Sequence, residues 1–154
     1  ETALAALAEF EPLEGRGAER EIAGFTLIDE SYNANPISMA SAIRTLGARP
    51  AKGRRIVALT DMLELGADGP GFHAGLAKDL VKAGIDLVFC AGPLMKSLWE
   101  ALPATRRGGY ADSAADLAPQ VVATVQPGDL VMVKGSNGSK AHVIAAALAA
   151  WGEG

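Results

Sequence analysis

The chain has 154 residues, enough for one domain with a substantial hydrophobic core. A net charge of -4 argues against nucleic-acid binding, and no run of about 18 apolar residues is present that could insert into a membrane. The single cysteine, Cys90, excludes an internal disulfide, so we expect a buried thiol and a cytoplasmic, reducing setting.

The first residues, ETALAALAEF, have the composition of a helix and lack an initiator methionine. We therefore expect a piece of a longer protein. Residues 15–24 have turn residues at both ends and mixed polarity between them. This pattern predicts an edge strand or hairpin arm that leads into the next strand.

Four short apolar runs rich in β-branched residues predict strands covered on both faces, as in a parallel sheet. Between them, apolar residues recur every third or fourth position, which predicts helices with one buried stripe. The predicted strands are 25–29, 55–60, 86–91 and 129–135, and the helical stripes are 39–46, 72–80, 94–102 and 143–151. The alternation indicates an α/β domain, doubly wound, with a mostly parallel sheet and helices on both faces.

Three segments are less regular. Residues 107–110 predict a short strand. Residues 112–125 predict a helix that starts late or kinks, because Pro119 removes a backbone hydrogen bond. The stretch LGADGPG, residues 65–71, is the one long loop that the sequence predicts.

Polar residues gather directly after three predicted strands, at 29–36, 61–73 and 134–142. In open α/β sheets, ligands bind in the crevice beyond the carboxyl ends of the strands. The three clusters therefore predict a binding edge.

Each cluster allows a binding role and a simpler structural one. Asp29 and Glu30 can accept hydrogen bonds from ribose hydroxyls, whereas Asn35 followed by proline also suits the start of a helix. The glycine- and serine-rich third cluster suits an anion at the start of the last helix, or only a turn and a cap.

The second cluster holds Asp61, Glu64, Asp68 and His73, residue types that ligate metals. Their spacing matches no zinc or EF-hand template, so we favour a structured loop that shapes the cleft. We expect His142 to be a surface or packing residue.

Four segments resemble motifs of the MurF-type ligases of the Mur ligase family, in the same order. FEPLEGRGAE resembles PLxGRG, IDESYNANPISM resembles DDSYNANP, TDMLELG followed by a histidine resembles GDMxELG, and VKGSNGS resembles VKGSR. The resemblance covers most of the chain, from about residue 10 to about residue 150.

This resemblance implies an ATP-dependent amide ligase of bacterial cell-wall synthesis. In such ligases ATP phosphorylates a carboxylate of UDP-N-acetylmuramoyl-tripeptide, and the amine of D-alanyl-D-alanine attacks the acyl phosphate. Residues 1–10 would end the central ATPase domain or form a linker helix, and residues 11–154 would form the Rossmann-like C-terminal domain. ATP and Mg²⁺ are the implied cofactors, with the Mg²⁺ ligands in the central domain, so we expect this chain alone to be inactive.

The resemblance also implies site residues. Arg16 matches the arginine that reaches the nucleotide, and Asp29 or Glu30 matches the acid at the ribose. Asn33 and Asn35 match polar residues along the nucleotide edge of the cleft.

The segment Lys134, Gly135, Ser136 and Asn137 matches the region that faces the incoming dipeptide. The motif's arginine is Asn137 here, so Lys134 or helix N–H groups would have to contact the dipeptide carboxylate. Two alternatives share the fold: a standalone nucleotide-binding module, and another ligase of the superfamily, such as one that adds glutamate to folate.

Overall fold

The computed structural model describes residues 18–32 and 34–151. Six strands and five helices alternate along this part of the chain, with three short 3-10 turns. The strands are β1 (Ala18–Ile22), β2 (Phe25–Glu30), β3 (Arg55–Thr60), β4 (Leu87–Ala91), β5 (Arg107–Ala111) and β6 (Leu130–Lys134). The helices are α2 (Pro36–Ala48), α3 (Gly69–Lys82), α4 (Met95–Ala101), α5 (Ala114–Thr124) and α6 (Ala141–Trp151), and the turns are η1 (Gly66–Asp68), η2 (Ala104–Arg106) and η3 (Asn137–Ser139).

The strands form one sheet in the order β1-β2-β6-β3-β4-β5. All neighbouring pairs are parallel except β1 and β2, which form an antiparallel hairpin at one edge. Every predicted strand is present, and so is the predicted edge arm before β2. The mostly parallel, doubly wound α/β fold is confirmed.

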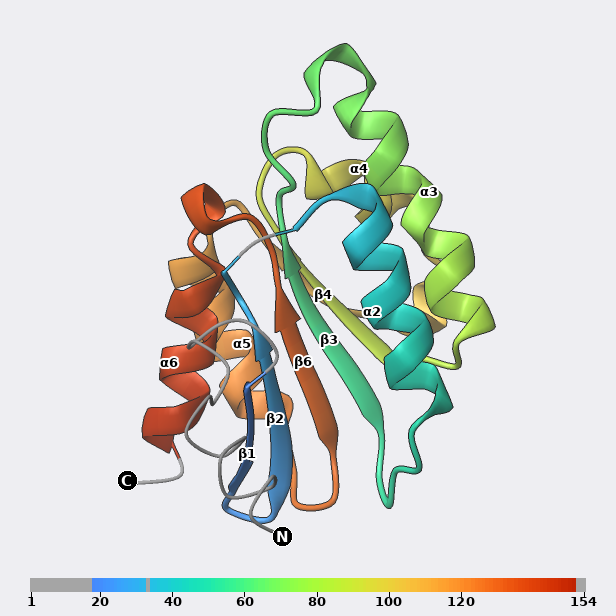
Figure 1. Cartoon of the computed structure of the whole chain (residues 1–154). Helices are drawn as coiled ribbons and strands as arrows, with labels where there is room; N and C mark the ends of the chain where they lie inside the picture. The colour runs from blue at the N-terminus through green and yellow to red at the C-terminus, as the bar shows by residue number, and fades with distance from the viewer. Residues whose placement is uncertain (1–17, 33, 152–154) are drawn as a thin grey trace, which may run out of the picture.

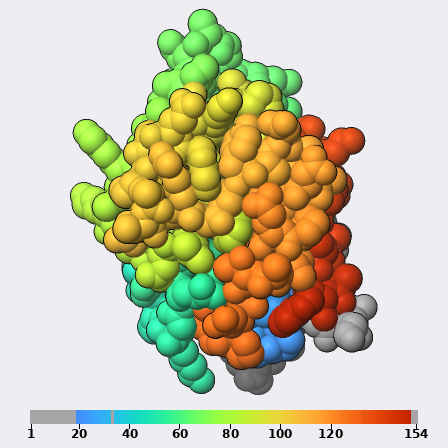
Figure 2. Space-filling model, turned by 180° about the vertical axis from the view of Figure 1, so that it is seen from behind, coloured from blue at the N-terminus to red at the C-terminus, as the bar shows by residue number. Residues whose placement is uncertain are grey.

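Helices cover both faces of the sheet, α2, α3 and α4 on one and α5 and α6 on the other (Figure 1). A hydrophobic core lies on each face of the sheet, and alternate residues of β3 pack into one or the other, because successive side chains of a strand point to opposite faces. Val57 and Leu59 pack with the α2 side, whereas Ile56 and Ala58 pack with the α5 side. From behind, the segments from α4 to α5 cover much of the visible surface, with α6 at one side (Figure 2).

Local sequence explains where α2 begins. The Asn35 side chain accepts a hydrogen bond from the backbone N–H of Ser38 at 2.9 Å, and Ser38 Oγ accepts one from the N–H of Asn35 at 3.1 Å. Pro36 follows at the first helical position, where its missing N–H costs nothing. Asn35 is thus an N-cap, as one of its two predicted roles requires.

Two predictions about local structure are wrong. The stretch 65–71 is not one long loop, because η1 occupies its middle and α3 begins at Gly69, with Pro70 in the first turn. The helix predicted over 112–125 does not start late, because it begins at Ala114 and runs through Pro119, and the alternative of a kink at Pro119 stays a prediction. Pro119 is exposed, so the carbonyl that lacks its N–H partner can bond to water.

Cys90 is buried in β4, and burial raises the pKa of its thiol to about 12. The thiol therefore stays protonated at neutral pH and acts as a core side chain. No helix in the described part of the chain is both long and apolar enough to cross a membrane.

Candidate functional site

The three polar clusters meet at one edge of the sheet because β2, β6 and β3 are parallel neighbours. Glu30 pairs with Lys134 across one side of β6, and Leu59 pairs with Lys134 across the other. The segments that follow these strands start at the same level, at the upper edge in Figure 1. The structure thus brings the clusters together as expected from the sequence.

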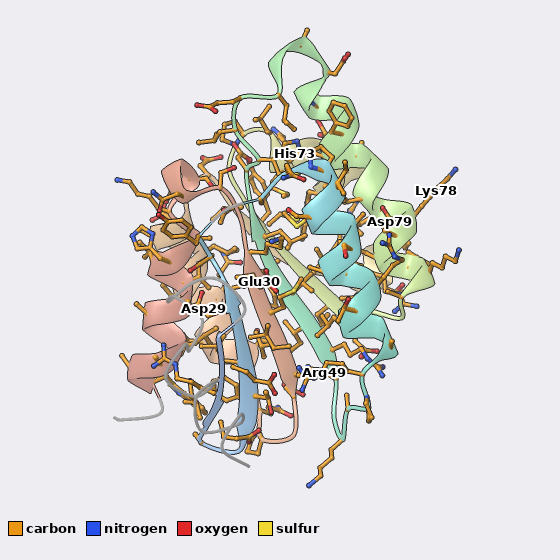
Figure 3. All side chains as sticks on the ribbon, viewed as in Figure 1. Asp29, Glu30, Arg49, His73, Lys78 and Asp79 are labelled. Carbon is orange, nitrogen blue, oxygen red and sulfur yellow. The ribbon has the colours of Figure 1, made fainter. Side chains whose placement is uncertain are left out.

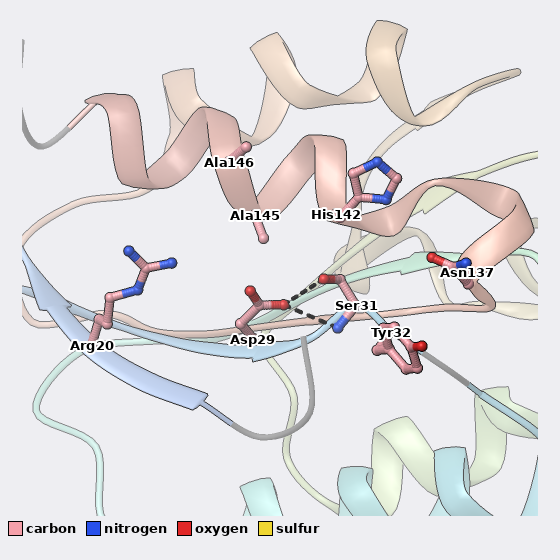
Figure 4. Close-up of a pocket in the computed structure, with 8 residues that line it drawn as sticks. All are labelled: Arg20, Asp29, Ser31, Tyr32, Asn137, His142, Ala145 and Ala146. Carbon is pink, nitrogen blue, oxygen red and sulfur yellow. Dashed lines mark hydrogen bonds between the residues drawn. The ribbon is translucent and has the colours of Figure 1, made fainter. Parts of the chain in front are cut away.

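Asp29 faces α6 and borders a cavity of about 350 Å³, here called the Asp29 cavity (Figure 4). The residue is only 2% exposed, and its Oδ1 accepts hydrogen bonds from Ser31 N at 3.0 Å and Ser31 Oγ at 2.5 Å. These bonds fix the carboxylate at the cavity wall. The other polar lining residues are Arg20, Tyr32, Asn137 and His142.

Glu30 faces the opposite side of the sheet and borders a second cavity of about 350 Å³ under α2, the Glu30 cavity. Lys134 Nζ lies 3.1 Å from Glu30 Oε1, and Lys134 is only 4% exposed. Arg49 pairs with both carboxylate oxygens of Glu19, at 2.9 and 2.8 Å, and this hydrogen bonding lowers the pKa of Glu19. Hydroxyls of α2 complete the lining: Ser38, Ser41 and Thr45.

Gly135 and Ser136 hold the loop after β6 against the end of β3. A side chain at Gly135 would overlap Thr60 Oγ1, so only glycine fits this close approach. Ser136 Oγ accepts a hydrogen bond from Leu63 N at 2.9 Å, and Ser136 N donates to the Asp61 carbonyl at 3.3 Å. Gly135 and Ser136, two of the residues predicted to bind the substrate, therefore help to hold the fold together. Binding of a substrate would be a second role for them.

His73 ties the loop after β3 to the start of α3. Its buried ring accepts a hydrogen bond at Nε2 from Met62 N at 2.9 Å and donates from Nδ1 to the Gly69 carbonyl at 2.6 Å. His73 itself belongs to α3 and is labelled in Figure 3. Within residues 18–32 and 34–151, no three or more His, Cys, Asp or Glu side chains are grouped so that they could hold a metal ion.

Asp61 joins the ends of β3 and β4. Its Oδ1 accepts from Met95 N at 2.8 Å and its Oδ2 from Leu94 N at 3.2 Å, at the start of α4. Burial raises the pKa of the Asp61 carboxyl, although these two backbone bonds act in the opposite direction.

A third cavity, of about 420 Å³, lies between the loops that follow β3, β4, β5 and β6. Leu63 forms part of its wall, and we call it the Leu63 cavity. Its charged and hydroxyl-bearing lining residues are Asp61, Asp112, Ser113, Ser139 and Lys140.

The predicted site residues are therefore distributed over more than one cavity. Asn137 borders the Asp29 cavity, whereas Lys134 borders the Glu30 cavity. Arg16 and Asn33 lie outside the described residues, so their predicted nucleotide contacts stay predictions.

Sequence reasoning missed several residues that border the cavities, among them Arg20, Arg49, Asp112 and Lys140. No motif marks them. Arg20 reaches the Asp29 cavity through the register of the β1–β2 hairpin, which pairs Ala18 with Asp29 and so puts Arg20 on the same face. The alternation of side chains between the two faces of the predicted edge strand was the signal that could have identified Arg20.

Comparison with known proteins gives the family. Residues 15–137 match the family described as Mur ligase, glutamate ligase domain, so the chain belongs to this family, whose members are ligases. UDP-N-acetylmuramoyl-tripeptide–D-alanyl-D-alanine ligases of Bacillus subtilis and Rickettsia prowazekii are 32% and 28% identical over 79% and 87% of the chain. The chain spans 27% and 30% of the lengths of these two relatives.

Solved structures of MurF ligases resemble this chain. MurF from Acinetobacter baumannii has a TM-score of 0.78 and 26% identity, covering 89% of this chain and 31% of its own. MurF from Thermotoga maritima in complex with ADP shows the same fold, with a TM-score of 0.79 at 24% identity. The match covers 96% of this chain and 33% of that protein. A bifunctional folylpolyglutamate synthase/dihydrofolate synthase with Mn, AMPPNP and L-glutamate bound has a lower TM-score of 0.61 at 26% identity, covering 88% and 32%.

Proposed function

We propose that this chain is the C-terminal domain of an ATP-dependent ligase that adds D-alanyl-D-alanine to UDP-N-acetylmuramoyl-tripeptide. The convergence of the DESYNANP, DMLEL and KGSNGS segments on one sheet edge carries this proposal. It is supported by relatives of that name that match most of the chain. Residues 11–154 would form the domain, and residues 1–10 would end the central ATPase domain or link to it.

The reaction joins two substrates through an activated carboxyl group. ATP would transfer its terminal phosphoryl group to a carboxylate of the tripeptide, releasing ADP. The dipeptide amine would then attack the acyl carbon, forming the amide, losing a proton and displacing phosphate. Mg²⁺, held in the central domain, would neutralise phosphate charge, and the domain's role would be to position both ligands and exclude water.

The residues at the sheet edge would divide this work. Arg16, Asn33 and Asn35 would line the nucleotide, with Asp29 or Glu30 at the ribose. The loop from Lys134 to Asn137 would face the dipeptide. The relative solved with AMPPNP and Mn supports nucleotide and metal use in this superfamily. The reaction and the buried Cys90 thiol both suit a cytoplasmic location.

A ligase that adds glutamate to folate is the competing function, and the lower TM-score of the folylpolyglutamate synthase speaks against it. A standalone nucleotide-binding module would leave the four ordered motifs unexplained.

Assay of the full-length gene product separates these functions. With ATP, Mg²⁺ and UDP-N-acetylmuramoyl-tripeptide, we expect phosphate release that depends on D-alanyl-D-alanine. L-glutamate should not replace the dipeptide. The present chain alone should unfold cooperatively and release no phosphate. Turnover by this chain alone, or a preference for folate and glutamate, would contradict the proposal.

A further inference from the structure

The Leu63 cavity combines features that suit a small zwitterion. At about 420 Å³ it falls within the usual size of small-molecule sites. Much of its wall consists of small or apolar side chains, and its charged lining residues are one lysine and two aspartates. The small apolar lining residues are Ala91, Pro93, Ala114, Ala115 and Val143.

Lys140 is a cation without a partner in the described part of the chain. It is exposed, and none of the ion pairs among these residues involves it, whereas Lys134, at the end of β6, is buried against Glu30. Asn137 carries no charge and borders the Asp29 cavity instead. Of Lys134 and Lys140, only Lys140 lines the Leu63 cavity.

The backbone at Lys140 is held in an uncommon conformation. Its φ of 63° and ψ of 36° lie in the left-handed region, where glycine is favoured. Hydrogen bonds at 3.0 Å from Lys140 N to the Asn137 carbonyl and from Val143 N to the Lys140 carbonyl fix it there. These bonds fix the backbone of Lys140 at the place where its residue lines the Leu63 cavity.

The opposite charge comes from another loop. Asp112 directly follows β5, whereas Lys140 lies between β6 and α6, so the two charged residues reach the cavity wall from different loops. Asp112 Oδ1 accepts a hydrogen bond from the Tyr110 hydroxyl at 3.4 Å, whereas Asp61, the other acid in the wall, accepts two from backbone N–H groups.

Leu63 gives the cavity its apolar wall. It is 37% exposed, and its N–H is held by Ser136 Oγ. A side chain at Gly138 would meet Leu63 Cδ1 at 2.7 Å, so glycine lets Leu63 lie across this loop. The Leu63 side of the wall is apolar and therefore suits methyl groups.

We propose that the Leu63 cavity binds the dipeptide substrate, with Lys140 holding its carboxylate and Leu63 selecting its small side chains. This inference rests on the proposed function and adds residues to it. The dipeptide ammonium end lies on the Asp112 side of the cavity. Lys134 then serves the fold through its pair with Glu30.

A substrate-analogue cycle in the full-length enzyme tests the role of Lys140. The KM is measured for D-alanyl-D-alanine and for its C-terminal amide, which lacks the carboxylate, in the wild type, Lys140→Met and Lys140→Arg. The wild type should show a KM about tenfold or more higher for the amide, as loss of a charged hydrogen bond predicts. Lys140→Met should raise the dipeptide KM to a similar extent and treat acid and amide alike, whereas Lys140→Arg should retain the preference for the acid.

The controls distinguish the ways in which this can fail. Lys78→Met, on the exposed face of α3 (Figure 3), should leave both KM values unchanged. An equal rise for acid and amide in Lys140→Met that preserves the wild-type ratio, or no change in either KM, would overturn the role of Lys140 while leaving the ligase function standing. Absence of wild-type turnover with D-alanyl-D-alanine would overturn the proposed function and this inference together.

Discussion

Asp29 and Glu30 are consecutive residues of β2, yet their carboxylates line cavities on opposite faces of the sheet. Asp29 lies on the α6 side and Glu30 on the α2 side, where Lys134 pairs with it. A single nucleotide ribose can therefore not be held by both acids within one cavity.

This geometry predicts that mutation of Asp29 and mutation of Glu30 have different effects on ATP binding. In the full-length enzyme, either Asp29→Asn or Glu30→Gln should raise the ATP KM, and the other should leave it near the wild-type value. Loss of a charged hydrogen bond to ribose costs roughly 1.5–3 kcal/mol, which corresponds to a rise of about tenfold or more. Steady-state kinetics at saturating dipeptide gives the answer, and equal effects of both variants, or none, would exclude the ribose assignment.

The Glu30 cavity contains two ion pairs that differ in burial, which allows a matched comparison. Lys134 and Glu30 have side chains 5% and 30% exposed, whereas Arg49 and Glu19 are 35% and 46% exposed. Double-mutant cycles with Lys134→Met and Glu30→Gln, and with Arg49→Met and Glu19→Gln, should give a coupling of roughly 1–3 kcal/mol for the first pair and about 0–1 kcal/mol for the second. Urea unfolding of this chain measures both, and equal couplings would show that burial does not strengthen the pair.

The two histidines provide another matched pair. His73→Phe keeps the ring volume but leaves Met62 N–H and the Gly69 carbonyl without their bonds, so it should destabilise the fold by roughly 2–4 kcal/mol. His142 is exposed, and His142→Phe should change the free energy of unfolding by less than about 0.5 kcal/mol. Similar stability of the two variants in chemical denaturation would refute the structural role of His73.

Asp129 predicts a loss of stability in acid. Burial alone would raise the pKa of this carboxyl, but hydrogen bonds from Arg54 and from the N–H groups of Gln126 and Arg54 lower it overall. Because the pKa is lower in the folded state, this stabilisation is present above the unfolded pKa of about 3.9 and is lost as the pH falls through the folded pKa. The free energy of unfolding should therefore fall as the pH is lowered from 5 to 2.

Asp129→Asn is the control for that experiment. It should be less stable than the wild type at pH 7, by roughly 1–3 kcal/mol, and its stability should depend less on pH below 4. Parallel pH profiles of the two proteins would assign the acid sensitivity to other groups.

Much of the fold could be predicted because hydrophobic periodicity reports burial directly. The continuous apolar run of β3 and the four-residue repeats of α3 and α6 identify their elements without tertiary information. Pro119 misled the prediction because proline usually interrupts a helix, whereas here its side of α5 is exposed. Gly69 and Gly71 led to the prediction of a loop at 65–71, because glycine suggests a loop even where a helix forms.

The candidate site could be predicted only as far as the edge of the sheet. That Asp29 and Glu30 lie at the carboxyl end of a strand is plain from the sequence, but the cavity that each acid borders depends on how α2 and α6 pack. Lys140 gave no signal of its own, because its left-handed backbone and its position beside the Leu63 cavity arise from the loop between β6 and α6.

The central claim is that the carboxyl edge of this sheet is the ligand-binding edge of a ligase domain. Amide hydrogen exchange of the full-length protein, with and without AMPPNP, Mg²⁺ and D-alanyl-D-alanine, tests it most directly. We predict slower exchange at residues 29–35, 61–65 and 134–140 in the presence of ligands, and no change at the far end of α3 around Lys82. Unchanged exchange in all three segments, or protection confined to the opposite edge of the sheet, would contradict the claim.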